Sequence, residues 1–406
     1  MKKILSIVLA TAMLLSFGLL AGCGDETPDA GDDRVVTVKD NTITMGMVTP
    51  LTGGAAVYGA AVKNGIELAI KEINASSTVL NGYTIKLDTK DSQSDPTVGA
   101  PAFTSLIDSG AAAIFGPVIT SVTAACTTIA NENNVVMITP SATGDNVTTE
   151  SDYVFRSCFK DSYQGRIVAQ YAKKKGYTEV AVLYAQGDSY SSGLRDAFVD
   201  ECGKLGITVK VEMTSPTISN ETTFSSQLAT IIDQIGTNGF LFAPYYYEAA
   251  GLMIIPEARA KGFTGVIMGV DGMDGMVPGY VTGDKANYNN VFFTNHYSAE
   301  STADVVQNFI TAYKAEYNED PNAFSALAYD AAYMMAKALE DVLKETPDSV
   351  SGAKLKAAMD GMKFSGVTGD FTLDETGTPS KSAVIIEYYY DEANDAVAAK
   401  YVETLG

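Results

Sequence analysis

Residues 42–74 read TITMGMVTPLTGGAAVYGAAVKNGIELAIKEIN, a short apolar run followed by a loop and a long helical pattern. The first part predicts a buried strand over 42–48, because a continuous apolar run bounded by turn residues is typical of a strand covered on both faces. The loop from Thr49 to Gly54 consists mostly of small residues, and a helix is predicted over 58–74. The stretch is therefore one strand–loop–helix unit.

That unit recurs along the chain. Asp95 and Pro96 favour the start of the second helix, since Asp can cap a helix and Pro fits its first position. Repeated strand–helix–strand patterns with apolar strands predict parallel sheets covered on both faces. Two such series meet near residue 160, so the predicted fold class is α/β with two doubly wound parallel-sheet lobes. The predicted strands are 42–48, 83–88, 112–115, 135–138, 179–184, 207–213, 239–242 and 265–268, and the helices between them are 58–74, 97–109, 121–133, 163–175, 190–205, 223–235 and 247–261.

The last third of the chain has a different pattern. Two helical runs, 302–317 and 322–345, follow each other almost directly. A shorter helix over 353–360 and a terminal strand near 383–390 come after them.

The N-terminus predicts a lipoprotein signal peptide over residues 1–22. Lys2 and Lys3 precede an uncharged apolar run that ends in Leu20-Ala21-Gly22-Cys23, the layout of a secretory signal. A membrane span is the alternative, but the run is at the low end of spanning length. The last four residues resemble the bacterial lipobox, in which the cysteine is acylated, so Cys23 is the predicted lipidation site. Residues 23–40 are rich in Gly, Pro and Asp and predict a flexible acidic tether.

Composition limits the classes of function. The 406 residues carry a net charge of −21, and removal of Lys2 and Lys3 with the signal would lower it by two, to −23. Such an acidic body argues against nucleic-acid binding, which needs basic surface. The length exceeds one ordinary core and predicts two lobes. Beyond Cys23 the cysteines are Cys126, Cys158 and Cys202, whose odd number implies at least one free thiol and whose spacing fits no zinc site.

Residues typical of catalysis are scarce. The chain has one histidine, His296, and no tryptophan, and we interpret a lone histidine as a structural group. No nucleophile elbow, phosphate-binding loop, dinucleotide fingerprint or zinc-protease motif occurs. The acids Asp88, Asp91 and Asp95 lack the spacing of a calcium loop. We therefore predict no enzyme activity, no metal and no cofactor, and an anchored hydrolase is disfavoured because no catalytic set supports it.

Polar side chains instead follow the predicted strands. The strand at 135–138 runs into Thr139-Pro140-Ser141-Ala142-Thr143, and other strand ends carry hydroxyls, phenols and one acid. In open parallel sheets ligands bind beyond the carboxyl ends of the strands. Any one of these residues could be an ordinary turn or cap. Together they suit an α-amino acid. A helix start can bind its carboxylate, an acidic side chain can bind its ammonium, and aromatic walls can surround an apolar side chain. The other residues are Thr49, Thr52, Tyr58, Thr120, Ser121, Tyr190, Tyr245, Tyr246, Tyr247 and Asp271.

From about residue 43 to 390 the sequence resembles the type I solute-binding proteins of branched-chain amino-acid ABC transporters, the leucine/isoleucine/valine-binding protein family. The resemblance depends on several stretches in the same order: GMVTPLTGGAAVYGAAVKNGIELAIKEIN, DSQSDP, FGPVITSVT, MITPSAT, FRSCFKDSYQG, GDSYSSG, PYYYEAAGLMIIPEARAKG, IMGVDG and NAFSALAYDAA. It implies the type I periplasmic-binding-protein fold with a three-crossover hinge near residues 160, 295 and 382. Lobe 1 is then 41–159 with 295–382, and lobe 2 is 160–294 with 383–406.

The resemblance also implies the ligand contacts. The hydroxyl of Thr120 and the backbone N–H and hydroxyl of Thr143 bind the ligand carboxylate. The Ser141 carbonyl and the Asp271 carboxylate bind the ammonium. The aromatic walls are Tyr58, Tyr190 and Tyr246, and Ile119 and Phe324 line the side-chain pocket.

Some positions depart from the family pattern. Asp271 replaces the usual glutamate and reaches one methylene less far, and an insertion leaves Tyr246 and Tyr247 as alternatives for the wall. The family's disulfide cysteine falls on Ile119, so that bridge is absent.

The resemblance implies an extracytoplasmic, lipid-anchored protein that captures an amino acid, with apolar or branched-chain ones favoured, and delivers it to the transmembrane subunits of an ABC permease. The alternatives are a ligand-sensing receptor on the same fold, or a binder of amides, urea-like solutes or carboxylic acids.

Overall fold

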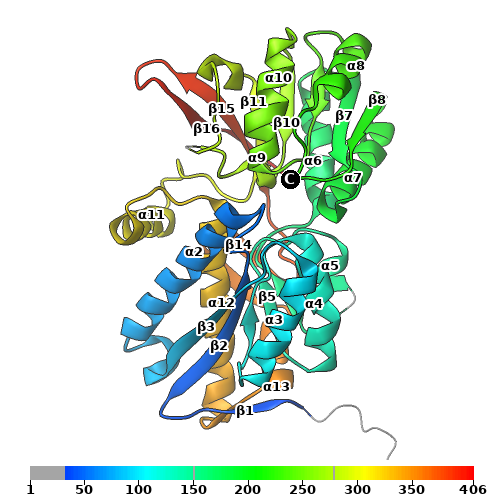
Figure 1. Ribbon diagram of the computed structural model, residues 1–406. Helices are drawn as coiled ribbons and strands as arrows, with labels where there is room; N and C mark the ends of the chain where they lie inside the picture. Colours follow the sequence, from blue (N-terminus) through cyan, green and yellow to red (C-terminus); the bar gives the residue numbers. More distant parts are fainter. Residues whose placement is uncertain (1–32, 150, 278) are drawn as a thin grey trace, which may run out of the picture. The chain divides into compact units, whose positions relative to one another are not determined.

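Two separate β-sheets organise the chain in the computed structural model, which describes residues 33–149, 151–277 and 279–406. Helices cover each sheet (Figure 1). Residues Arg34–Gly406 form one unit by their contacts. Within it, we call the part built on the five-stranded sheet lobe 1 and the part built on the seven-stranded sheet lobe 2.

The sheet of lobe 1 is entirely parallel. Its interior strand β2 has a buried C-terminal half, including Met45, Met47 and Val48 at 0% exposure, as expected for a strand covered on both faces. Four of the five strands match predicted segments. The fifth, β6, was not predicted, since it spans three residues and contains Arg156. The strand order is β3 (Thr84–Asp91), β2 (Thr42–Thr49), β4 (Ile114–Phe115), β5 (Met137–Thr139) and β6 (Val154–Arg156).

Two long helices of lobe 1 pack closely although they are distant in sequence. A Cβ at Gly65 on α2 would lie 2.2 Å from the Ser325 carbonyl of α12, so only glycine permits this approach. On α3, the Asp95 side chain accepts a hydrogen bond from the Thr97 N–H and Pro96 opens the helix, as predicted. The helices of lobe 1 are α2 (Ala56–Ala75), α3 (Pro96–Asp108), α4 (Thr120–Glu132), α5 (Asn146–Thr149), α11 (Asp304–Tyr317), α12 (Ala323–Glu345) and α13 (Gly352–Met359), with the hairpin β13 (Lys363–Gly366) and β14 (Gly369–Thr372).

The sheet of lobe 2 is mixed rather than wholly parallel. Strands β8, β7, β9, β10 and β11 are parallel, whereas β15 and β16 run antiparallel at one edge. The prediction of a parallel sheet therefore holds for five strands and is wrong for this edge. The strand order is β16 (Ala396–Leu405), β15 (Ala383–Asp391), β11 (Val291–Asn295), β10 (Val266–Gly269), β9 (Phe240–Phe242), β7 (Glu179–Ala185) and β8 (Thr208–Ser215).

The helices of lobe 2 largely follow the predicted segments. The exception is 247–261, predicted as one helix, which is interrupted by a π-helical turn over Ala250–Ile254. The helices are α6 (Asp161–Lys174), α7 (Ser189–Leu205), α8 (Ser225–Ile235), α9 (Tyr247–Ala249) and α10 (Ile255–Ala260).

The chain passes between the two sheets three times, as the fold class predicts. The passages lie between β6 and α6, between β11 and α11, and between β14 and β15. Of the positions predicted for the crossovers, 160 and 382 lie in the first and third connections, and 295 is the last residue of β11, directly before the second. Because the carboxyl ends of both sheets face this junction, residues there can contact one ligand from two sides.

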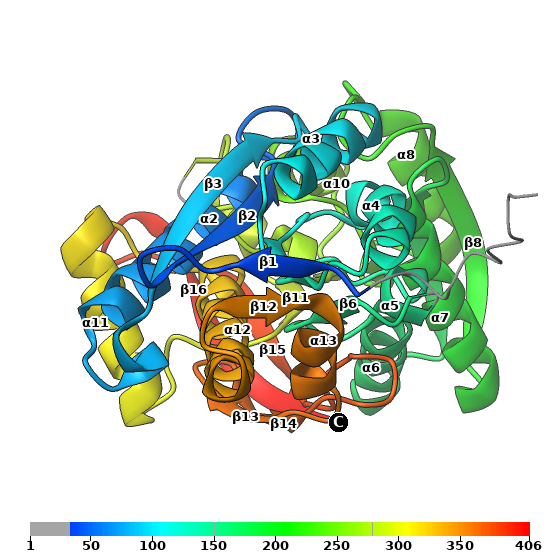
Figure 2. The same ribbon diagram turned by 90° about the horizontal axis from the view of Figure 1, so that it is seen from below.

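The predicted flexible tether over 23–40 is too long at its C-terminal end. Strand β1 (Val35–Thr37) pairs antiparallel with β12 (Ser349–Ser351) (Figure 2). The Arg34 guanidinium donates hydrogen bonds to the carbonyls of Ala111 and Ile107. These partners are more than seventy residues away, which is why local composition did not reveal them. The predicted signal peptide 1–22 and the lipidation site Cys23 lie outside the described residues.

The cysteines of the described chain are buried and free. Cys126, Cys158 and Cys202 form no disulfide with one another. Burial raises the pKa of each thiol to about 12, so all three are protonated at neutral pH and unreactive. The prediction of at least one free thiol is confirmed and extends to all three. In the part of the chain that the structure describes, no helix is long and apolar enough to cross a membrane.

Candidate ligand-binding site

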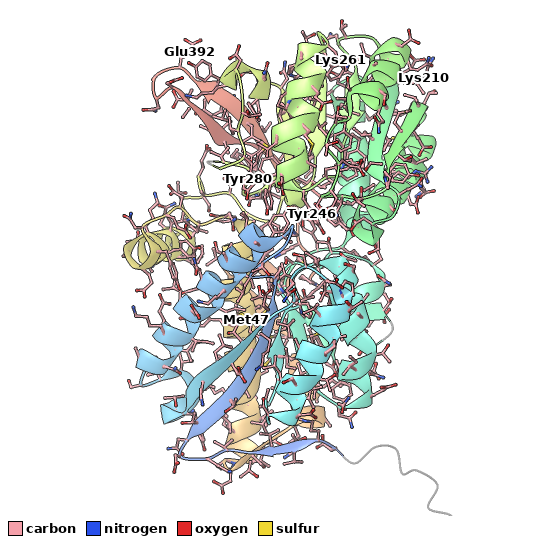
Figure 3. The ribbon with its side chains drawn as sticks, viewed as in Figure 1. Met47, Lys210, Tyr246, Lys261, Tyr280 and Glu392 are labelled. Carbon is pink, nitrogen blue, oxygen red and sulfur yellow. The ribbon has the colours of Figure 1, made fainter. Side chains whose placement is uncertain are left out.

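A small cavity lies where the two lobes meet, and eight of the nine residues predicted for the ligand site line it. Thr143 is the exception. Lobe 1 and lobe 2 both contribute, and the labelled Tyr246 marks the position of the cavity in Figure 3. The enclosed space is about 20 Å³, room for roughly one water molecule. The lining residues are Tyr58, Val118, Ile119, Thr120, Ser141, Tyr190, Tyr246, Asp271, Gly272 and Phe324.

The lobe 1 side of the cavity is formed by a helix start and the loop after β5. Thr120 is the first residue of α4, and the preceding Ile119 offers no side-chain cap, so the first N–H groups of the helix are not satisfied by a cap. The Thr120 hydroxyl accepts a hydrogen bond from the Gly144 N–H at 3.2 Å. The Ser141 hydroxyl donates to the Val118 carbonyl at 2.8 Å. These contacts hold two hydroxyls at the edge where a carboxylate is expected.

Next to this edge lie two buried polar side chains, Thr143 and Asp161. A hydrogen bond from the Thr143 hydroxyl acts to lower the pKa of the Asp161 carboxyl, and neither side chain has another hydrogen-bond partner within the described chain. Burial and, next, the nearby Asp271 carboxylate raise the pKa of Asp161 well above its ordinary value. The backbone around them is firmly held, since the Thr143 carbonyl accepts from Arg156 at 3.0 Å and from the Asp161 N–H at 2.8 Å. Asp161 was not predicted, because nothing in its local pattern distinguishes it from an acid at an ordinary helix start.

The lobe 2 side of the cavity centres on Asp271, which lies two residues after the end of β10 and is 2% exposed. Its Oδ1 accepts hydrogen bonds from the Tyr190 hydroxyl at 2.7 Å, from Gln164 Nε2 at 3.1 Å and from the Gly272 N–H at 3.1 Å. Its Oδ2 lies 3.3 Å from His296 Nε2. The carboxylate is therefore fixed in orientation from several sides.

The histidine interpreted from the sequence as a structural group, His296, contacts Asp271, which was not foreseen. The imidazole stacks on Phe159, with 3.7 Å between ring centroids. Burial lowers the pKa of His296, an effect that Asp271 opposes. We infer a neutral ring that carries its hydrogen on Nε2 and donates it to Asp271, because the carboxylate is an acceptor.

Aromatic rings form the remaining walls. Tyr58 and Phe324 stack with centroids 4.1 Å apart, and Tyr246 meets the Tyr58 ring edge-on at 5.3 Å. Of the two tyrosines left as alternatives, Tyr246 lines the cavity. Tyr247 lies behind Tyr58, and its hydroxyl donates to the Gly54 carbonyl at 3.2 Å.

Direct hydrogen bonds hold the lobes together around the cavity. The Tyr58 hydroxyl of lobe 1 donates to the Gly272 carbonyl of lobe 2 at 2.5 Å. Asp274 of lobe 2 accepts a hydrogen bond from the Ala323 N–H at the start of α12, at 2.7 Å. This arrangement is a closed one, and sequence analysis did not identify Asp274.

Across the described ranges, no group of three His, Cys, Asp or Glu residues is arranged to hold a metal ion. What the site offers is hydroxyls, a helix start, one carboxylate and aromatic rings, enclosed between two lobes. These features define a two-lobed binding protein for a small polar solute.

The comparisons with known proteins agree with that class. The family model described as periplasmic binding protein matches residues 42–393. Leu/Ile/Val-binding protein homolog 3 of Brucella melitensis is 31% identical over 338 residues, which cover 82% of this chain and 88% of the relative. The chain belongs to the periplasmic binding proteins, in the Leu/Ile/Val-binding protein family.

Solved structures give the same result. The branched-chain amino acid transporter substrate binding protein LivJ from Streptococcus pneumoniae, in complex with isoleucine, is 29% identical with a TM-score of 0.78 and covers 89% of this chain and 99% of its own. The leucine binding protein LivK from Thermotoga maritima is 29% identical with a TM-score of 0.76, covering 89% and 98%. The chain is thus an extracytoplasmic solute-binding component of an ABC transporter and not an enzyme.

Proposed function

We propose that this protein binds an α-amino acid with an apolar, branched side chain between its lobes. The observation that carries the proposal is the polarity of the cavity: hydroxyls and a helix start on lobe 1 face a fixed carboxylate on lobe 2. A carboxylate ligand suits unsatisfied N–H groups and the positive end of a helix. A ligand ammonium can pair with the buried Asp271 carboxylate. The two ends of the cavity thus match the two charges of an amino acid.

Each residue then has a defined role. The Thr120 and Thr143 hydroxyls, with the Thr143 N–H, bind the carboxylate. The Ser141 carbonyl and Asp271 bind the ammonium, and Tyr190 orients Asp271 through its hydroxyl. The rings of Tyr58, Tyr246 and Phe324, together with Ile119, surround the side chain.

Binding requires the lobes to separate first. A space of about 20 Å³ is smaller than any amino acid, so the rings and the lobe 2 edge must move apart to admit one. Once the ligand is bound, its contacts with both lobes stabilise the closed state. The stabilisation equals the difference between the ligand's binding free energies for the closed and the open states. The relatives named for leucine, isoleucine and valine support the side-chain class.

A second candidate ligand is a carboxylic acid without an ammonium. It is favoured by the surroundings of Asp271, whose oxygens already have four donors within the described chain. An ammonium has to replace or share one of them, whereas a plain carboxylic acid leaves them intact.

Isothermal titration with isoleucine, leucine and valine tests the proposal. We expect Thr120→Val to weaken binding at least tenfold, since hydrogen bonds to a charged group are worth about 1.5–3 kcal/mol. Thr128→Val on the same helix is the control, because Thr128 is exposed. Absence of binding of all three amino acids to the parent protein, or equal affinity of both variants, would refute the assignment.

We also propose that the protein is anchored to the outer face of the cell membrane through an acylated Cys23 and delivers its ligand to ABC permease subunits. The support is the signal-like segment that ends in Leu20-Ala21-Gly22-Cys23.

A further inference from the structure

A second, larger cavity lies at the hinge, on residues that the amino-acid site does not use apart from His296. It measures about 600 Å³, within the usual range for small-molecule sites. Its lining comes from the second and third passages between the lobes, 296–306 and 381–384, and from one segment of each lobe, 367–370 and 401–404. A molecule bound there would touch both lobes and two of the three connections about which they move.

The cavity contains a cation that forms no ion pair within the described chain. Lys381 donates one hydrogen bond, from Nζ to the Thr368 hydroxyl at 2.8 Å. An ammonium has three N–H donors, so two make no hydrogen bond in the described residues, although Nζ also lies 5.0 Å from the centroid of the Phe371 ring. The charge of Asp330 attracts Lys381, but the Asp330 carboxylate is bonded to the N–H groups of Val367 and Thr368 and to the Thr368 hydroxyl. Burial lowers the pKa of Lys381 to about 8, so the ammonium is retained at neutral pH despite its desolvation.

The rest of the lining combines hydroxyls with an apolar surface. Val306, Val367 and Val384 form the apolar part. Two acids, Glu300 and Asp370, also line the cavity, and both are exposed. Their charges disfavour a ligand with several negative groups and leave room for one negative group near Lys381. The hydroxyls belong to Ser298, Ser301, Thr302, Thr368, Ser382 and Thr404.

We propose that this hinge cavity is a second ligand site, which binds a small organic acid with its single carboxylate at Lys381 and its apolar body against the valines. The ammonium with its two free N–H donors, the hydroxyls and the apolar wall each match one part of such a molecule.

His296 connects this cavity to the amino-acid site. Its ring lines the hinge cavity, while its Nε2 contacts Asp271. Occupancy of the hinge cavity therefore alters the amino-acid affinity, and by thermodynamic linkage the amino acid alters the affinity of the hinge ligand by the same factor. This coupling, unlike the hinge site itself, depends on the proposed amino-acid binding.

The probe for the test is hexanoate, titrated against the full chain and followed by ligand-observed NMR. We expect hexanoate to bind the parent protein and Lys381→Met to weaken it at least tenfold, because a charge-assisted contact is lost. Lys337→Met is the matched control, since Lys337 is an exposed lysine that bonds the Lys363 carbonyl elsewhere on the surface. Thr120→Val, which alters only the interlobe site, should also leave hexanoate affinity unchanged.

Three outcomes would overturn the hinge site: no binding to the parent protein, equal binding to Lys381→Met, or loss of binding in Thr120→Val instead. Ser382→Trp fills the cavity from an exposed wall position while keeping Lys381, so it repeats the test if Lys381→Met is poorly folded. For the coupling, we expect saturating hexanoate to change the leucine Kd at least threefold in the parent protein and not in Lys381→Met. An unchanged leucine Kd refutes the coupling, and a protein that binds hexanoate but no amino acid refutes the proposed function alone.

Discussion

Asp271 and His296 lie 3.3 Å apart, Oδ2 to Nε2, and both side chains are almost fully buried. Asp271 follows β10 in lobe 2, and His296 directly follows β11 at the second passage between the lobes. A neutral imidazole offers the carboxylate a hydrogen bond without cancelling its charge. The site thereby keeps a negative group available for a cationic ligand atom inside a closed cavity.

The charge of Asp271 should decide whether amino acids bind. A buried ammonium without its negative partner costs about 3–5 kcal/mol, so we expect Asp271→Ala to weaken isoleucine binding more than a hundredfold. Asp271→Asn retains an acceptor for the Tyr190 hydroxyl and the Gly272 N–H but loses the charge. Isothermal titration of the Asn variant should also show a large loss, with the exposed Asp320→Asn as control.

Near-parental affinity of Asp271→Asn would contradict the ammonium assignment. The ligand would then carry no paired ammonium at this point, and the carboxylic-acid candidate would replace the amino acid.

Asp161 should make stability depend on pH. Burial, then Asp271 and to a smaller extent Asp145, raise the folded-state pKa of Asp161, and the Thr143 hydrogen bond and the Arg156 charge oppose this only in part. Below the ordinary pKa of 3.8 both states are protonated and the group has no effect. Above this pH the unfolded state has released its proton while the folded state still holds it. The free energy of unfolding therefore decreases with rising pH until the pH passes the folded-state pKa.

Asp161→Asn removes that loss. We expect its free energy of unfolding, relative to the parent, to rise with pH above about 4, by up to roughly 1.4 kcal/mol per pH unit within the window. Urea denaturation at several pH values between 4 and 8 measures this. The exposed Asp108→Asn should show no such trend, and a pH-independent difference for Asp161→Asn would rule out the mechanism.

Acylation should depend on one residue. We expect Cys23→Ala to abolish labelling of the protein by a radioactive fatty acid in the producing cell, because the lipobox cysteine is the acceptor. Cys126→Ala is the control, since its thiol is buried. Labelling that persists in Cys23→Ala would place the lipid elsewhere.

The strand β2 and the helices α2 and α4 were predictable because their apolar patterns are local. The strand β16 was not, since it carries Lys400 and Glu403 and is stabilised by pairing with β15 rather than by an apolar pattern of its own. The strand β11 was not predicted either. It is fully buried, but no helix follows it closely enough in the sequence to complete a strand–helix unit.

The site was predictable to the extent that strand ends determine it. Thr120, Ser141 and Asp271 follow strands of parallel sheets, so the fold brings them to one junction. Asp161 and His296 could not be assigned from sequence. Their roles depend on burial and on contacts such as the one between His296 and Asp271, which no local pattern encodes.

Asp274 should control closure of the lobes. Its Oδ2 accepts from the Ala323 N–H at 2.7 Å and from Asn295 Nδ2 at 3.0 Å, so one carboxylate joins the start of α12 in lobe 1 to the last residue of β11 in lobe 2. The positive end of a helix favours this charge. Asp274→Ala removes a contact that exists only when the lobes are closed. At about 1.5–3 kcal/mol for hydrogen bonds to a charged group, the closed population falls and the apparent isoleucine affinity should drop about ten- to a hundredfold.

Asp284→Ala is the matched control, because Asp284 caps a short helix within lobe 2 and contacts nothing across the junction in the described chain. Titration gives the affinity, and small-angle X-ray scattering of the ligand-free protein should show a larger radius of gyration for Asp274→Ala alone; unchanged affinity and radius would mean that this contact does not hold the lobes together.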